Sequence, residues 1–270
     1  LLIVAAVLLW MIFALWPKWL VLLIGRKKVF LSALFNGITL GALYFLVASG
    51  FTLIFGLMRN VNLAHGSLYL MGGYIGFEVA EATGYWLIAF PVAFLLVGAV
   101  GVALQVLVFR RMEGQDLRQT LVTIGISIVL ADLMLWGWGG DFYQVQTPTW
   151  LSGPLETILV TAQKRSGALV YLKYPLVRVV IFLAAVAIGI AMWLLLNRTR
   201  VGMLIRAGVD DRDMLSATGV RIQLVFAGVF AFGAGLAGLA GVVGGTFQAL
   251  APGEDVRFLL YSLIVVIVGG

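Results

Sequence analysis

The sequence predicts an all-α polytopic membrane protein, a transmembrane helical bundle of about seven to eight spans with one broken or re-entrant helix. Three observations predict it. Of the 270 residues, 62% are hydrophobic and only 11% are charged, which is less than half of the roughly 25% that soluble domains carry. The mean hydropathy is +1.08. The apolar runs are long and unbroken, which favours helical spans over the ~10-residue alternating strands of a membrane β-barrel.

The composition also bounds the chemistry. The chain has no cysteine and a single histidine, so we expect no disulfide, no thiol catalysis and no metal site built from histidine or thiolate. No Gly-Lys pair occurs, and a phosphate-binding P-loop is therefore absent from the sequence. We expect no cofactor and no catalytic residues in this chain. The net charge of +6 fits basic loops on one side of a membrane and does not indicate nucleic-acid binding.

The first two apolar segments precede a polar interruption. Leu1 to Ile24 is long enough for a retained first span, and Val29 to Leu57 is longer than one span needs, so it could begin with an interfacial turn. Within it, Gly37 and Gly41 have the spacing that permits two helices to approach closely. We treat residues 1–270 as a single transmembrane domain and expect the protein to continue beyond the last residue.

Polar residues then interrupt the apolar pattern at Asn60, Asn62, His65 and Gly66. Such a break is either a loop at the surface or a broken helix whose backbone faces protein or a water-filled cavity. An amino-acid or amide substrate needs hydrogen-bonding groups along an apolar route, so these four residues are candidates for a substrate pathway. The competing interpretation is that a lone histidine is a hydrogen-bonded structural residue.

The remaining spans follow in order. They are predicted at residues 87–109, 120–138, 176–196, 222–250 and from 258 onward. Asp132 lies within one of them, and a carboxylate inside a span is a functional candidate by default, although it can also pair with a neighbouring helix or lie near the outer end. Residues 139–175 form a longer polar stretch. Gln248, Pro252 and Gly253 suit a second break near the outside.

Small residues recur every four positions in two further segments. Gly72 and Gly76 follow the polar interruption, and Ala237, Gly241 and Gly245 lie in the span at 222–250. These stripes predict faces that pack against another helix or subunit.

Basic residues predict the orientation. The loops near residues 110 and 198 are cytoplasmic by the positive-inside rule, because together they contain Arg110, Arg111, Arg118, Arg198, Arg200, Arg206, Arg212 and Arg221. The stretch 139–175 then lies outside. Counting spans back from there also puts residues 26–28 outside, although their basic side chains favour the inside.

The segment from Asn197 to Arg221 is the most charged part of the chain, and it must lie in water. Its second half predicts a short helix, with Asp210 as N-cap and Gly219 at the end. Met214 and Leu215 are apolar side chains on a short helix in water, and this pattern indicates a surface bound by another protein. The alternative is a solvated loop.

Two motifs resemble the branched-chain amino acid ABC-transporter permease family. The stretch GMLIRAGVDDRDMLSATGV resembles that family's cytoplasmic coupling loop, and the Asn-x-x-His-Gly element at residues 62–66 lies in a second matching segment. The resemblance runs from about residue 30 to the end and excludes the first span. It implies that the loop docks on an ATPase subunit, and the matching residues are Gly202, Arg206, Ala207, Asp210, Asp211, Met214, Leu215 and Gly219.

The resemblance further implies a permease subunit of an ATP-driven importer in a bacterial inner membrane. Its implied partners are a second related permease chain, two ATP-binding subunits and a periplasmic substrate-binding protein, in addition to membrane lipid. Urea and short-amide permeases share the motifs, so the substrate stays open. A self-contained secondary transporter or channel is the alternative of another class. It would predict several paired charges within the spans, where only Asp132 qualifies.

Overall fold

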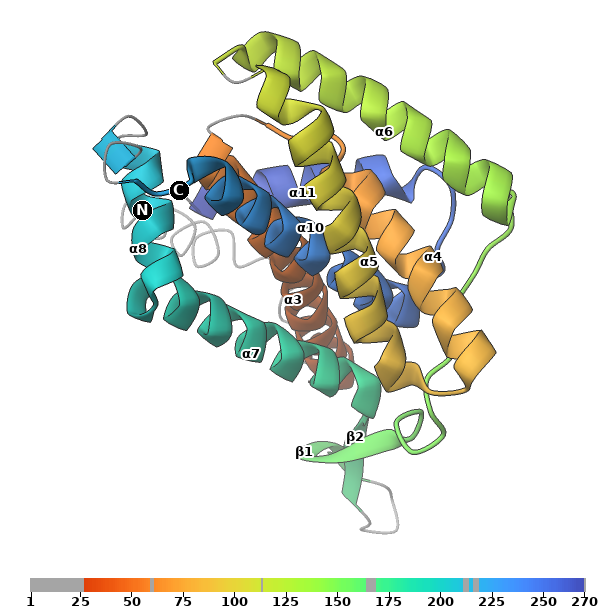
Figure 1. The fold of residues 1–270 in the computed structure, drawn as a ribbon. Helices are drawn as coiled ribbons and strands as arrows, with labels where there is room; N and C mark the ends of the chain where they lie inside the picture. Colours follow the sequence, from red (N-terminus) through yellow and green to blue (C-terminus); the bar gives the residue numbers. More distant parts are fainter. Residues whose placement is uncertain are drawn as a thin grey trace, which may run out of the picture.

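The computed structural model describes residues 27–58, 61–112, 114–163, 169–210, 214–215 and 219–269. These residues form a bundle of helices with one small β-hairpin (Figure 1). The predicted first span, residues 1–24, lies outside the described part. In order, the elements are α3 (Lys27–Met58), α4 (His65–Thr83), α5 (Trp86–Leu107), η1 (Phe109–Met112), α6 (Asp116–Trp138), β1 (Pro154–Gln163), β2 (Leu169–Pro175), α7 (Leu176–Arg198), α8 (Arg200–Asp210), α10 (Ile222–Phe247) and α11 (Glu254–Gly269).

Five of these helices are long and apolar enough to cross a membrane: α3, α5 with η1, α6, α7 and α10. The all-α polytopic class is confirmed. α4 and α11, with 19 and 16 residues, are shorter. α3 is one continuous helix of 32 residues without an initial turn, which corresponds to about 48 Å.

α10 is the central helix, and it packs on α3, α4 and α5. Its small residues allow this. A Cβ atom on Gly72 of α4 would lie 2.2 Å from the Cα of Gly238, and one on Gly241 would lie 1.9 Å from the backbone oxygen of Tyr69. Ala237 is fully buried, and Gly76 and Gly245 also contact neighbouring side chains closely. The small-residue faces of α4 and α10 therefore pack on each other at backbone distance.

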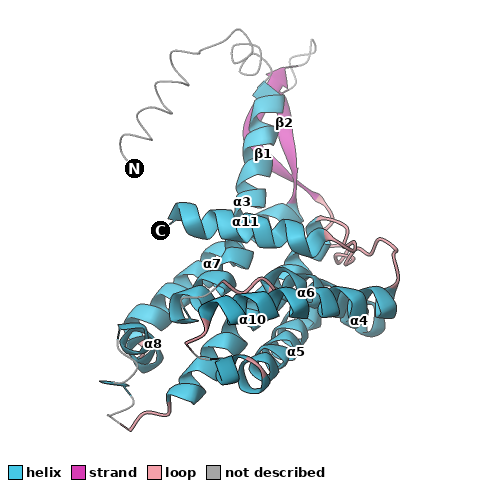
Figure 2. Ribbon diagram, turned by 90° about the horizontal axis from the view of Figure 1, so that it is seen from above, coloured by secondary structure: helices cyan, strands magenta, loops and turns pink. Residues whose placement is uncertain are grey.

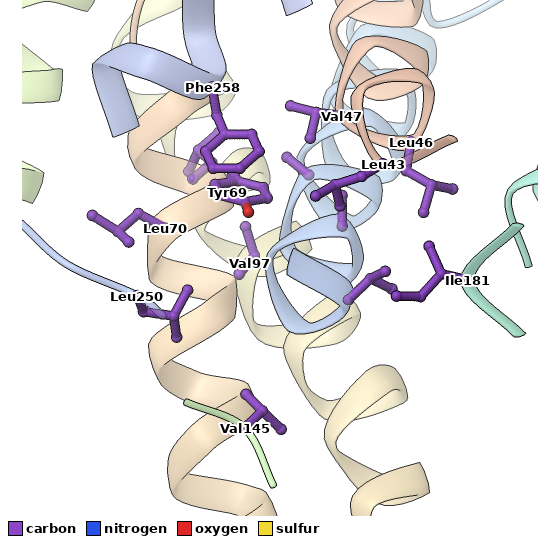
Figure 3. Close-up of a cluster of buried hydrophobic side chains, with 14 of the residues drawn as sticks. Leu43, Leu46, Val47, Tyr69, Leu70, Val97, Val145, Ile181, Leu250 and Phe258 are labelled. Atoms are coloured by element: carbon purple, nitrogen blue, oxygen red, sulfur yellow. The ribbon is translucent and has the colours of Figure 1, made fainter. Parts of the chain in front are cut away.

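Large side chains fill the space beside these backbone contacts. Figure 3 shows Tyr69 stacked on Phe258 of α11, with Leu43, Leu46 and Val47 of α3 on the other side. The two ring centroids are 4.1 Å apart. This cluster ties α3, α4 and α11 together at the centre of the bundle.

The face of α3 that carries Gly37 and Gly41, unlike the small-residue faces of α4 and α10, does not pack against another helix of the described chain. Both glycines are exposed, and a Cβ atom at either position would meet nothing within 4 Å among the described residues. The expected close helix approach is therefore not made within the described chain. The reason is that α10 packs further along α3, where a Cβ on Gly50 would lie 2.4 Å from the backbone oxygen of Gly233.

The polar stretch after α6 contains an antiparallel hairpin, β1–β2, which pairs Pro154 with Pro175. The sequence analysis did not predict it. It lies beside the start of α3 (Figure 2), where the hydroxyl of Tyr174 is 2.8 Å from both the backbone oxygen of Phe35 and Oγ1 of Thr39. The start of α3 and the segment 139–175 thus lie on the same side of the bundle, as counting spans implied.

α4 begins deep inside the bundle. Nε2 of His65, its first residue, lies 3.0 Å from the backbone oxygen of Val47, which is eleven residues, or about 16 Å, back from the end of α3. The chain therefore ends α3, returns into the bundle and starts a new helix there. Of the two possibilities for this polar break, the structure shows the broken helix.

α11 begins after a second break, at residues 248–253, and its start is also buried. A Cβ atom on Gly66 would lie 2.0 Å from the backbone oxygen of Asp255, so the first turns of α4 and α11 touch. The sequence placed this second break near the outside. In the structure the chain turns back after α10, with Leu250 against Gly73, and reaches the first turn of α4.

Candidate functional site

The first turns of α4 and α11 meet inside the bundle beside α6, and five polar side chains lie in or next to these turns. We call this group the polar junction; it consists of Asn62, His65, Ser67, Ser127 and Asp255. Four of the five are almost fully buried, and Ser127 is half-buried. Burying a polar group costs free energy unless it is hydrogen-bonded, so the hydrogen-bond partners of each group are given below.

His65 is completely buried. Its Nε2 bonds to the backbone oxygen of Val47 at 3.0 Å, and its ring lies edge-on against Phe51 with centroids 5.4 Å apart. These contacts give it the structural role expected of a lone histidine. Its second nitrogen, Nδ1, is buried with no hydrogen-bond partner among the described residues.

Asn62 lies at the N-terminus of α4. Its Oδ1 accepts the backbone N–H of Ala64 at 3.1 Å, which holds the side-chain amide next to the first turn. Its Nδ2, also buried, has no partner in the described part of the chain. The adjacent N–H of Leu63 donates to Oγ1 of Thr123 at 3.1 Å, so α6 holds the polar break in place.

Ser67 links three helices. Its Oγ lies 2.8 Å from Oγ of Ser127 on α6 and donates to Oδ2 of Asp255 on α11 at 3.0 Å. Asp255 is 4% exposed. The ion pair found on this helix joins its neighbours Glu254 and Arg257 at 3.2 Å, and no cationic side chain of the described residues is paired with Asp255.

The sequence analysis found part of this site. It identified Asn62, His65 and Gly66, and the structure brings them together. It missed Ser67, Ser127 and Asp255. The available signal was the Glu254-Asp255 pair after Pro-Gly in an otherwise apolar segment, because first-turn acids mark a helix start.

Asn60, a predicted pathway residue, lies outside the described residues. Asp132, another, is described and does not join the junction. Asp132 is exposed on α6, five residues after Ser127, and five residues turn a helix by about 140°. Its carboxylate therefore does not share the face that Ser127 presents to Ser67, and a place for Asp132 in the pathway stays a prediction.

Two open cavities lie at the opposite end of α4. One, of about 530 Å³, is lined by Glu81, Trp86 and residues 146–149 among others. The other cavity has a similar volume. It shares Gln146 and Thr147 with the first and is also lined by Phe142, Tyr143 and Thr246. Nε1 of Trp86 is buried without a partner in the part that the structure describes.

The charged segment after α7 begins with a sharp corner. A Cβ atom on Gly202 of α8 would lie 2.1 Å from the backbone oxygen of Leu196 on α7. Oγ1 of Thr199 accepts the N–H of Gly202 at 3.2 Å, which satisfies one free donor at the start of α8. Nη1 of Arg206 donates to Oδ1 of Asn197 at 3.2 Å across the corner.

The charged segment contains a helix that the sequence analysis did not predict. This helix, α8, ends at Asp210. Met214 and Leu215 are also helical, in the part where the short helix is predicted, and the N-cap role of Asp210 stays a prediction. Ile205 anchors α8 among Leu53, Phe226 and Val229 of α3 and α10.

The segment exposes some of the residues predicted to dock on a partner and buries others. Arg206 and Ala207 are exposed and Met214 is 68% exposed, whereas Leu215 is buried and is not part of the exposed surface. Gly219 adopts a positive φ of 82° where the chain turns toward α10. Asp211 lies outside the described residues.

Comparison with known proteins agrees with this architecture. Residues 33–270 match the family model described as branched-chain amino acid transport system / permease component. The chain is 30% identical over 231 residues to the high-affinity branched-chain amino acid transport system permease protein LivH of Escherichia coli, covering 82% of this chain and 72% of that protein. The LivH protein of Salmonella typhimurium gives the same figures.

The permease protein BraD of Pseudomonas aeruginosa is 27% identical over 252 residues, which cover 89% of this chain and 79% of BraD. No solved structure gives a significant match. The chain is a polytopic helical bundle with a broken helix and a charged segment between two spans, and the family model matches nearly its whole length. It therefore belongs to the branched-chain amino acid transport system permease component family.

Proposed function

We propose that this chain is a permease subunit of an ATP-driven importer and translocates branched-chain amino acids across a bacterial inner membrane. The observation that carries the proposal is the family match over residues 33–270. It is supported by a buried polar junction at the contact of two helices that begin inside the bundle, an arrangement that suits a solute site within the membrane. In this proposal ATP is hydrolysed by two partner subunits, and a periplasmic binding protein delivers the substrate to a pair of permease chains.

The structure supports a route by which the partners act on the junction. α8 packs through Ile205 on α3 and α10. α3 in turn carries Val47, whose backbone oxygen holds His65 at the start of α4. A movement of α8 imposed by an ATPase subunit would therefore act on helices that hold the polar junction, as alternating access requires.

Uptake measurements test the substrate. Vesicles with the reconstituted transporter, its binding protein and internal ATP should take up labelled leucine, and excess unlabelled valine should block the uptake while urea should not. Uptake of urea but not leucine would replace the substrate with the short-amide alternative. Leucine uptake that persists without ATP would contradict the importer assignment and favour a secondary transporter.

Crosslinking tests the docking role of the charged segment. The chain has no cysteine, so Met214→Cys introduces a single thiol at an exposed position. We expect it to crosslink to a groove cysteine on an ATPase subunit. The control is Leu183→Cys, which is exposed on the middle of α7 and should give no crosslink. An intact complex in which neither variant crosslinks would contradict the docking assignment.

A further inference from the structure

We infer that the polar junction binds the two charged ends of the transported amino acid, with Asp255 holding the ammonium group and Asn62 the carboxylate. The inference rests on the proposed function and names the recognition site within it. It starts from a buried carboxylate and an unpaired buried donor that lie at touching helix ends.

Asp255 is suited to an ammonium group. Its side chain is almost completely buried, and the hydrogen bond that it receives comes from the neutral hydroxyl of Ser67. The N-terminus of α11 offsets part of the cost of burying its charge, but a carboxylate can accept about four hydrogen bonds. A cation brought by the substrate would add charged donors to this carboxylate.

The neighbours of Asp255 complete an acceptor set. Around Oγ of Ser67 lie the carboxylate at 3.0 Å, Oγ of Ser127 at 2.8 Å and the backbone oxygen of Ser127 at 3.4 Å. An ammonium group has three N–H donors and no acceptor. These oxygens come from α4, α6 and α11 and gather around the hydroxyl of Ser67, so an ammonium group placed beside that hydroxyl would have several acceptors within reach.

The donors for a carboxylate lie at the start of α4. Nδ2 of Asn62 is buried and unpaired in the described part of the chain, and Oδ1 of the same amide is fixed 3.1 Å from the N–H of Ala64. The amide therefore lies beside the first turn of α4, where free backbone N–H groups and the helix dipole favour an anion. Nδ1 of His65 is a second unpaired nitrogen at this helix start.

The contact between α4 and α11 brings the start of α11 to the first turn of α4, which Asn62 immediately precedes. The backbone oxygen of Asp255 occupies the space that a side chain at residue 66 would fill, and Ser67 joins the two helices one residue later. Because these first turns touch in the present structure, substrate binding must separate them. This separation would open the junction during the transport cycle.

The competing explanation is that Asp255 only clamps α11 onto α4 through Ser67. A clamp would contribute to the stability of the complex and to every activity that depends on the fold. A substrate ligand would affect transport, while docking of the binding protein and ATP hydrolysis remain intact. The two explanations therefore differ in which measured activities change together.

The test compares Asp255→Asn with Glu254→Gln in the complete reconstituted transporter. The control removes the same charge from the same helix turn, at a residue that pairs with Arg257 outside the junction. We expect Asp255→Asn to lower ATP-driven leucine uptake roughly 10- to 100-fold, the effect of losing a charged hydrogen-bond partner, while ATP hydrolysis stimulated by the loaded binding protein stays within about twofold of wild type. Glu254→Gln should change neither.

A second measurement covers the case in which Asp255→Asn reduces the amount of folded complex. A diazirine analogue of leucine, photolysed during turnover, should label peptides around residues 62–67 and 254–258 of the unmodified chain. Ser127→Ala, which removes one hydroxyl from the acceptor set, should reduce this labelling several-fold.

The outcomes separate the two levels of the proposal. If the unmodified transporter takes up no leucine, the proposed function fails and this inference fails with it. If it takes up leucine and Asp255→Asn does so equally well, or if uptake and stimulated ATP hydrolysis fall together when both are measured per assembled complex, the inference alone is overturned. Labelling confined to peptides away from the junction would also overturn it.

Discussion

Replacing Gly72 by valine should prevent the bundle from packing. A Cβ atom there would lie 2.2 Å from the Cα and 2.3 Å from the backbone oxygen of Gly238, and backbone atoms cannot move aside as a flexible side chain can. Overpacked substitutions in cores cost about 1–3 kcal/mol and occasionally more; with two helix backbones in contact we expect at least about 3 kcal/mol. The measurement is the thermal midpoint and the yield of monodisperse protein in detergent.

Gly41→Val is the matched control. Gly41 lies in a stripe of the same spacing, but a Cβ atom there would meet nothing within 4 Å in the described chain. The thermal midpoint of the isolated chain should therefore stay near that of the unmodified protein. Equal loss of stability in both variants would contradict the packing described for α4 and α10.

Replacing Gly202 by valine should abolish ATP-driven uptake while leaving the bundle folded. The new side chain would meet the backbone oxygens of Leu195 and Leu196 at 2.5 and 2.1 Å, so α8 could not keep its angle to α7. The effect is expected to be local, because α8 packs at the edge of the bundle mainly through Ile205. We expect uptake to fall by more than ~10-fold, together with loss of the crosslink from Met214→Cys.

The control for this experiment is Gly56→Val on α3, which faces open space near the same end of the bundle. It should retain uptake and crosslinking. If Gly202→Val transports normally, the corner between α7 and α8 does not position the charged segment for coupling. If it unfolds the whole chain, α8 contributes more to stability than its contacts indicate.

The two glycine stripes show why spacing alone does not identify a packed face. Gly37 and Gly41 have the same four-residue repeat as Gly72 and Gly76, yet the first pair faces open space and the second contacts α10. The repeat shows only that one face of a helix carries small residues. Whether another helix approaches that side depends on how all the helices are arranged.

Asp132 and Asp255 show likewise that a local sequence pattern does not identify which acid lies in the site. Asp132 lies in an apolar segment of the sequence, whereas Asp255 follows Glu254 and precedes Arg257. The sequence analysis selected Asp132 as a candidate because it lies within a predicted span. The structure exposes Asp132 and buries Asp255. The bond from Ser67 to Asp255 joins residues 188 positions apart, and no local pattern indicates such a contact.

The sequence by itself determined the membrane class, the order and approximate limits of the long helices, the position of the polar break at residues 59–66 and the charged segment at 197–221. These features depend on hydrophobicity, charge and backbone propensity, which act locally along the chain. Only the tertiary structure decided which small-residue face packs, that α4 and α11 start against each other, and which polar side chains share the junction. Those outcomes depend on contacts between distant segments, whose free energies appear only when the helices are packed together.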